Sequence, residues 1–286
     1  MKNFARDFSD KRAVEPVIAA VILTGTIVAL VTVAMVFANS LLTASVAQGD
    51  FNSARQFMRT VAMQTDDVAW QIGQTETVRY STMYGTVNVL NGALNYNITM
   101  TPVTGNQQTY TFSTAIVCFN MPTYDYSIFN NYSSQVWPSK VLNPVNNGSS
   151  APVATVFAVE KLPMVDGNYI RVVAAPVIRL INSTIATKTS STFYFDLYLP
   201  LLSLTSSPRL SQSLTLKSNS ISMWTQNNLK SISVSVSFPN AASGFDNTFF
   251  HFPRTAMTIT SPQQSGFTYV AQLYTSSVAV ALGANL

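Results

Sequence analysis

The stretch VIAAVILTGTIVALVTVAMVF, residues 17–37, carries no charged side chain over its whole length. As an α-helix, these 21 residues would be about 31 Å long, which matches the hydrocarbon core of a bilayer. The uncharged stretch extends further in both directions, from Pro16 to Gly49. This segment therefore predicts a helix that can cross a membrane.

Basic residues precede this segment within the short N-terminus, at positions Lys2, Arg6, Lys11 and Arg12. By the positive-inside rule, the N-terminus stays in the cytoplasm and the chain after the helix lies outside. Pro16 suits the first turn of a helix, because its missing N–H would have no partner there. We expect the helix to begin near Pro16.

The helix is expected to continue beyond the apolar stretch. From Phe51 the apolar positions recur in alternating steps of three and four, through Ala54, Met58, Val61, Thr65, Val68 and Ile72. This spacing is typical of helices that pack on other helices. No proline interrupts the chain to Gln71, so we predict one helix over 16–71, about 84 Å long.

A helix of this length is longer than one domain of this size can bury. We therefore expect the helices of many copies to bundle together. The positions expected to form such a shared core are Val17, Ile18, Val21, Ile22, Ile27, Val28, Val31, Phe37, Leu41, Phe51, Met58, Val61 and Val68.

After Gly73 the sequence changes to alternating apolar and polar residues, separated by turn residues such as Asn91-Gly92 and Asp166-Gly167. Short alternating strands with frequent turns favour an antiparallel β-sandwich of immunoglobulin-like type. The predicted class is α+β, with one long helix followed by one sandwich. The segment 143–151 is the best candidate for a linker if there are two sandwiches.

Composition argues against several classes of function. Only 10% of the residues are charged, and the 16 bases and 12 acids form no basic cluster, so nucleic acid is not an expected partner. The single Cys118 cannot form an internal disulfide, and the single His251 lacks a pattern of metal ligands around it. Asp66 and Asp67 are consecutive on the predicted helix and point apart, so they form a poor acid–base pair. We expect no enzyme, no cofactor and no metal.

Two features of the outer part concern its surface. Four Asn-X-Ser/Thr sequons are possible N-glycosylation sites: Asn97, Asn131, Asn147 and Asn182. Asn131 and Asn147 flank expected loops and are the better candidates. An aromatic-rich stretch is expected to be mainly core, with an adhesive loop as the alternative: Tyr124, Tyr126, Phe129, Tyr132 and Trp137.

Residues 11–23, KRAVEPVIAAVIL, resemble the processing region of archaeal type IV pilins and archaellins. That superfamily has a short charged leader that ends in basic residues and a small residue, followed by a hydrophobic helix. On this chain Lys11, Arg12 and Ala13 would end the leader, and Val14 would begin the mature protein. Bacterial-type pilins carry a glutamate at the fifth mature position, where this chain has Ile18.

The resemblance implies three parts: a cytoplasmic leader (1–13), a long helix (14–72) and an extracellular β-sandwich (73–286). It implies a structural subunit of an extracellular type IV pilus-like or archaellum-like filament, which forms a homo-oligomer through its helix and serves surface adhesion. The implied partners are a prepilin peptidase, an assembly ATPase and a polytopic membrane platform protein. The helix would reside in the membrane before assembly.

Two alternatives remain open at this point. The first is a membrane-anchored cell-surface or S-layer-associated protein with a β-sandwich ectodomain. The second is a secreted protein cleaved after Ala47, because Ser45 and Ala47 are the small residues that signal peptidase favours. Signal h-regions of about 7–15 residues are shorter than this apolar segment, which weighs against the second alternative.

Overall fold

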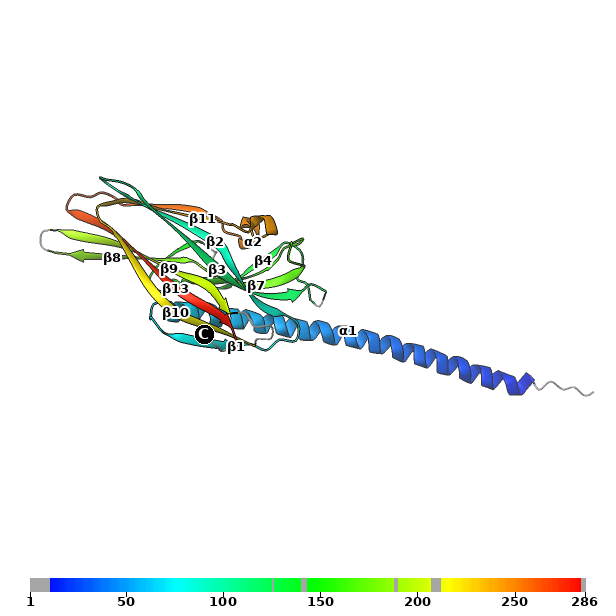
Figure 1. Ribbon diagram of the computed structural model, residues 1–286. Helices are drawn as coiled ribbons and strands as arrows, with labels where there is room; N and C mark the ends of the chain where they lie inside the picture. The colour runs from blue at the N-terminus through cyan, green and yellow to red at the C-terminus, as the bar shows by residue number, and fades with distance from the viewer. Residues whose placement is uncertain (1–10, 125, 140–142, 188–189, 207–211, 284–286) are drawn as a thin grey trace, which may run out of the picture. The chain divides into compact units, whose positions relative to one another are not determined.

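The computed structural model describes residues 11–124, 126–139, 143–187, 190–206 and 212–283, with only the backbone at 11–15. The chain divides into two compact units, Met1–Val46 and Ala47–Leu286. The described residues of the first unit form the N-terminal part of helix α1, and the second unit is a β-sandwich-like body that includes the C-terminal part of α1 (Figure 1).

Helix α1 extends over Lys11–Ala69, a length of 59 residues. It begins earlier than predicted and has Pro16 inside it. The expected start at Pro16 is therefore wrong, and the reason is local, because Lys11, Arg12, Ala13 and Glu15 are all strong helix formers. The end lies two residues before the predicted Gln71.

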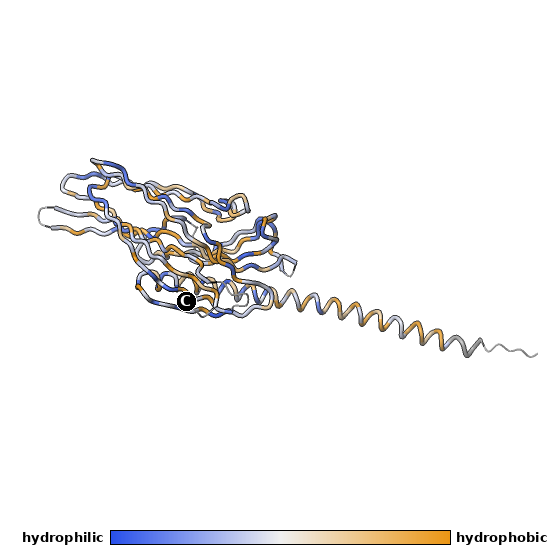
Figure 2. Tube along the Cα trace, in the orientation of Figure 1, coloured by the Kyte–Doolittle hydropathy of each residue, from blue (hydrophilic) through white to orange (hydrophobic). Residues whose placement is uncertain are grey.

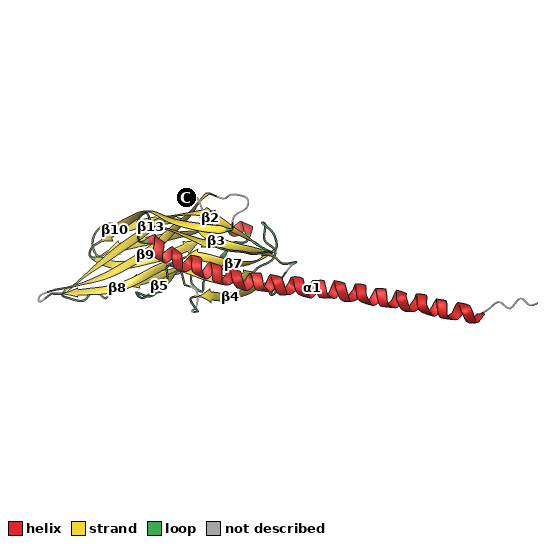
Figure 3. Cartoon of the chain, turned by 90° about the horizontal axis from the view of Figure 1, so that it is seen from below, coloured by secondary structure: helices red, strands yellow, loops and turns green. Residues whose placement is uncertain are grey.

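The strands form two sheets (Figure 3). The six-stranded sheet has the order β1-β10-β13-β9-β8-β5. Its strands are β1 Thr75–Arg79, β5 Val145–Asn147, β8 Ile178–Ala186, β9 Ser191–Ser206, β10 Ser213–Gln226 and β13 Phe267–Leu282. The seven-stranded sheet has the order β12-β11-β2-β3-β7-β6-β4. Its strands are β2 Thr86–Pro102, β3 Gln108–Pro122, β4 Tyr132–Trp137, β6 Ala154–Glu160, β7 Tyr169–Pro176, β11 Leu229–Ser237 and β12 Ala256–Thr260. Two short helices, η1 Ala241–Ser243 and α2 Asn247–Phe250, lie between β11 and β12.

Most neighbouring strands are antiparallel, but β13 pairs with β9 in parallel, and β5 pairs with β8 in parallel. The expectation of a wholly antiparallel sandwich is wrong in these two places. The chain between β9 and β13 forms β10, β11 and β12 before it returns, so no tight hairpin constrains their direction. The segment 143–151 is not a linker, because it contributes β5 to the six-stranded sheet.

The body has two apolar cores. The first receives alternate side chains from both sheets, including Tyr96 and Ile98 of β2, Ile232 of β11 and Leu197 of β9. The second receives the opposite faces of β3, β6 and β7, with Phe119, Val156 and Val172 among its members, and the C-terminal part of α1. Strands β6 and β7 are thus buried on nearly every residue, which explains why they are apolar at most positions instead of at alternate ones. Their buried polar residues are Thr155, Glu160 and Arg171.

Candidate assembly surface on the N-terminal helix

The first half of α1, residues 16–46, exposes apolar side chains on all sides, and the hydropathy colouring in Figure 2 is largely hydrophobic along it. By length and composition, α1 contains a segment that could cross a membrane. Nine of the predicted core positions lie here, and their side chains are 46% to 66% exposed: Val17, Ile18, Val21, Ile22, Ile27, Val28, Val31, Phe37 and Leu41. Apolar surface of this extent normally has a partner.

The polar side chains of the apolar stretch 17–37 are threonines whose hydroxyls bond within the helix. Thr24 Oγ1 donates to the carbonyl of Ala20, and Thr32 Oγ1 donates to that of Val28, both at 2.8 Å. Thr26 Oγ1 likewise donates to the carbonyl of Leu23 at 2.8 Å. These hydroxyls need no water, so residues 17–37 suit an environment that supplies none.

The second half of α1, from Ala47 to Ala69, differs because it is docked within the body. One stripe of the helix is buried there, and we call it the docking stripe: Ala47, Phe51, Ala54, Met58, Val61, Thr65 and Val68. Its members alternate in steps of four and three, and Met58, Val61 and Val68 have no exposed surface. Figure 3 shows this part of α1 running across the strands.

The docking stripe corrects two expectations. Phe51, Met58, Val61 and Val68 belong to the same buried cluster as the strands of their own chain, so they are not available to a helix–helix seam between copies. The boundary expected between residues 72 and 73 falls instead between Val46 and Ala47. The periodicity of a helix identifies a buried face, but a sheet can cover that face as well as another helix can.

Polar contacts fix both ends of the docked half. At its start, Asp50 Oδ2 accepts hydrogen bonds from the backbone N–H groups of Met83 at 2.6 Å and Tyr84 at 2.8 Å. Near its end, the Asp66 carboxylate accepts from Trp70 Nε1 and from Arg179 Nη1, each at 3.0 Å. These ties hold the helix in one register against the body.

Arg179 also contacts an aromatic side chain at the same place. Its guanidinium lies 5.2 Å from the ring centroid of Tyr198, and that ring meets Trp70 edge-on at 5.1 Å. Sequence reasoning identified neither Arg179 nor Asp50 as a contact. The position of Asp50 was the available signal, because it is the first charge after the long uncharged stretch.

The outer face of the docked half is polar. Its exposed residues include Gln48, Asn52, Arg59 and Asp67, and Met63 is its large apolar residue, 46% exposed. This face suits water or a polar neighbour, so the candidate assembly surface is confined to the first half of α1.

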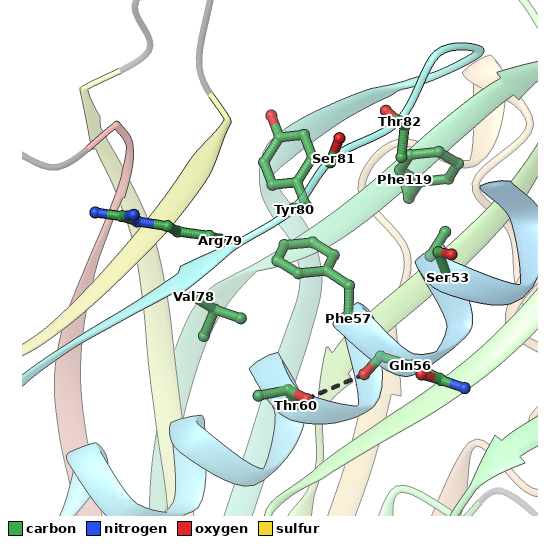
Figure 4. A pocket seen from close by; sticks show the side chains of 11 residues that line it. Ser53, Gln56, Phe57, Thr60, Val78, Arg79, Tyr80, Ser81, Thr82 and Phe119 are labelled. Atoms are coloured by element: carbon green, nitrogen blue, oxygen red, sulfur yellow. Dashed lines mark hydrogen bonds between the residues drawn. The ribbon is translucent and has the colours of Figure 1, made fainter.

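A shallow groove of about 240 Å³ lies beside the docked helix and is drawn in Figure 4. Ser53, Phe57 and Thr60 line it from α1, and residues 78–82 line it from the segment that includes β1. The rings of Phe57 and Tyr80 are 4.9 Å apart. Its lining residues include neither a carboxylate nor a histidine, so the groove offers no acid–base pair.

The other predicted residues lie apart from this surface. Lys11, Arg12, Ala13 and Val14 form the start of α1, where the backbone alone is described. His251 follows α2 with its Nδ1 3.3 Å from the carbonyl oxygen of Phe249. Within the described ranges, no group of three or more His, Cys, Asp or Glu side chains could hold a metal ion.

The four sequons and the aromatic stretch are distributed over the body. Asn97 is half-buried in β2, whereas Asn131, Asn147 and Asn182 are exposed. Tyr132 of the aromatic stretch is 39% exposed, and the other four residues divide into two groups. Tyr126 and Trp137 pack against the core that contains α1, while Tyr124 and Phe129 are more than four-fifths exposed.

Comparisons of the chain with family models, with curated proteins and with solved structures found no match.

Proposed function

We propose that this protein is the structural subunit of an extracellular type IV pilus-like or archaellum-like filament, and that it assembles through the first half of α1 and serves surface adhesion. The observation that carries the proposal is the exposure of apolar side chains on all sides of residues 16–46. The immunoglobulin-like character of the body belongs to the same proposal and is supported by two sheets of mainly antiparallel strands.

The proposed helix bundle uses a shorter segment of each helix than the sequence suggested. It contains residues 14–46, because the docking stripe is already covered by the protein's own strands. An apolar helix with internal backbone hydrogen bonds is stable both in lipid and among other helices. Assembly would thus move this segment from the membrane into a bundle of copies without exposing it to water.

Leader removal is consistent with the position of Pro16. In the uncut chain Pro16 lies inside α1, where a proline cannot donate to the carbonyl four residues earlier. After cleavage between Ala13 and Val14, Pro16 becomes the third residue, within the turn whose N–H groups have no helical partner in any case. Processing would thus place the proline where the helix tolerates it.

The proposed partners follow from this sequence of events. A prepilin peptidase would cut the leader at the cytoplasmic face, and an assembly ATPase with a polytopic platform protein would drive assembly. The membrane would hold the helix beforehand.

Two other functions use the same helix differently. A membrane-anchored surface or S-layer-associated protein would keep residues 16–46 in the bilayer. A protein cleaved after Ala47 would lose them, and this candidate is favoured because that cut lies one residue from the boundary between the two compact units.

Electron microscopy and N-terminal sequencing of the native protein, purified from its own cells, separate the three. We expect filaments whose subunits begin at Val14. Discrete particles that begin at Met1 would overturn the filament proposal in favour of an anchor. A soluble protein that begins at Gln48 would overturn it in favour of secretion.

A further inference from the structure

The structure distinguishes the four sequons from one another. Asn97 lies in β2 between β11 and β3, is half-buried, and its Oδ1 accepts a hydrogen bond of 2.8 Å from Thr111 Oγ1. Asn147 ends β5, and Asn182 lies within β8, where it pairs with Phe195. Asn131 alone among them occupies a turn between strands.

The turn at Asn131 begins with an aromatic residue. The backbone N–H of Tyr132 donates to the carbonyl of Phe129 at 3.1 Å, which closes a four-residue turn. Asn131 is the third residue of this turn, with a φ of 65°. A positive φ at the third position is the requirement of a type II turn, and asparagine meets it more easily than most residues. The side chain of Asn131 is exposed.

Phe129 is held in a costly conformation. Its φ is 106°, a value that residues with a Cβ adopt only when their surroundings enforce it. The surroundings here include Glu160, which is 1% exposed. Glu160 Oε2 accepts from the N–H groups of Ile128 at 2.7 Å and Phe129 at 3.2 Å.

The other side of the turn is fixed as well, because the Leu162 N–H donates to Asn130 Oδ1 at 2.8 Å. A buried carboxylate and a neighbouring loop thus hold a turn that leaves Phe129 83% exposed. A strained backbone that presents a large aromatic side chain to solvent marks a candidate contact site.

We propose that Asn131 carries an N-linked glycan whose first sugar covers the ring of Phe129. The negative face of an aromatic ring attracts groups with a partial positive charge, and the C–H groups on one face of a sugar ring are of this kind. The inference rests on the extracellular location in the proposed function, because the modifying enzymes act on that side of the membrane.

The modification is a group transfer from a lipid-phosphate-linked oligosaccharide. A bond forms between Asn131 Nδ2 and C1 of the sugar, and the bond from C1 to the phosphate oxygen breaks. The lipid phosphate leaves, and Nδ2 loses one proton.

The other exposed sequons provide internal controls. The residues two positions before Asn147 and Asn182 are Val145 and Leu180, and both are buried. Neither can offer an apolar surface to a sugar. We therefore expect the dependence on the residue at this position to be confined to Asn131.

Glycopeptide mass spectrometry of the full-length native protein tests occupancy. We expect Asn131 to be modified and its glycan to be absent from the Asn131→Gln variant. Phe129→Ala should lower occupancy at Asn131 severalfold and leave Asn147 and Asn182 unchanged, whereas Phe129→Tyr should restore it. A bare Asn131, or equal occupancy with alanine and tyrosine at position 129, would overturn the proposal.

Hydroxyl-radical footprinting tests whether the sugar covers the ring. Phe129 should be protected in the native protein and oxidised in the Asn131→Gln variant, while Tyr124, 85% exposed, should be oxidised in both. Equal oxidation of Phe129 in the two proteins would contradict the contact.

The same preparation separates this inference from the proposed function. Filaments with an unmodified Asn131 would support the filament proposal and overturn the glycan proposal. Discrete particles with a glycan on Asn131 would overturn the filament proposal and support the glycan proposal.

Discussion

The two halves of α1 are continuous in one helix and differ in every other respect. Residues 16–46 are apolar on all sides and exposed, whereas residues 47–69 bury one stripe and present a polar outer face. The stripe already has its partner in the same chain, while the first half has none within the described residues. The comparison teaches that the segment of α1 that takes part in folding is separate from the segment that we propose for assembly.

Truncation should have the largest effect among the tests that distinguish the two halves of α1. A chain that starts at Gly73 loses the docked half of α1, including five large buried side chains worth about 1.5–3 kcal/mol each: Phe51, Phe57, Met58, Val61 and Val68. This sum is comparable to the whole stability of a typical domain, about 5–15 kcal/mol, so the truncated chain should not fold.

A chain that starts at Ala47 keeps the stripe and should fold as a soluble, β-rich monomer. Circular dichroism and thermal melting of the two proteins measure the difference. A folded protein from the Gly73 start would show that the body does not need α1.

A charge within the docked half is the next test. Met58→Asp places a carboxylate at a position without exposed surface, and we expect a loss of about 4 kcal/mol or more in the free energy of unfolding. Met63→Asp is the matched control on the exposed face of the same segment and should change stability by about 0.5 kcal/mol or less. Chemical denaturation in detergent measures both. Similar losses from the two substitutions would contradict the assigned orientation of the stripe.

A charge within the first half should act on assembly alone. Val28→Asp adds a cost of about 2.5–3.5 kcal/mol for placing the carboxylate in an apolar environment. Every subunit of a filament would carry this cost, so filaments should be absent by electron microscopy. The melting temperature of the body should stay unchanged, and Val28→Leu should assemble normally. A Val28→Asp protein that still forms filaments would show that residues 16–46 are not the assembly surface.

The smallest expected effect is that of pH. Residues 16–46 contain no ionisable side chain, whereas the body contains several, so pH should affect only the body. Desolvation raises the pKa of Asp246, but hydrogen bonds from Lys161, Thr248 and the Phe249 N–H outweigh it and lower this pKa to about 2. A lowered carboxyl pKa stabilises the fold above the unfolded value of 3.8, and this contribution disappears as pH falls toward 2.

Because the Asp246 side chain is 37% exposed, solvent screening limits the effect to about 1 kcal/mol. The melting temperature of the body should therefore fall between pH 4 and pH 2. Asp246→Asn keeps a good N-cap residue for α2 and should flatten this dependence. Insertion of α1 into detergent micelles should not change over the same range.

The sequence predicted a helix or strand correctly where a single local property, hydrophobicity or alternation, is enough to determine it. The apolar stretch 17–37 predicted a helix, and alternation predicted strands such as β2 and β11, because each has one face toward a core. It did not predict β12, which is short, or the parallel pairing of β9 with β13, because pairing depends on residues far apart in the chain.

The candidate surface was predictable in part for a related reason. Hydrophobic spacing identified the buried side of residues 51–68, but spacing carries no information about which surface covers it. The strands that do so, among them β3 and β7, follow much later in the sequence. Likewise, the contact of Asp66 with Arg179 joins residues separated by more than a hundred positions.

The single cysteine has a consequence for the durability of the proposed filament. Cys118 is 2% exposed in the core between the sheets, and burial raises the pKa of its thiol to about 12, so it is inert toward oxidants and other thiols. Disulfide bonds can therefore stabilise neither the body nor an assembled polymer. Reducing agents should leave such a polymer intact, and detergents, which compete for apolar helix surface, should be what takes it apart.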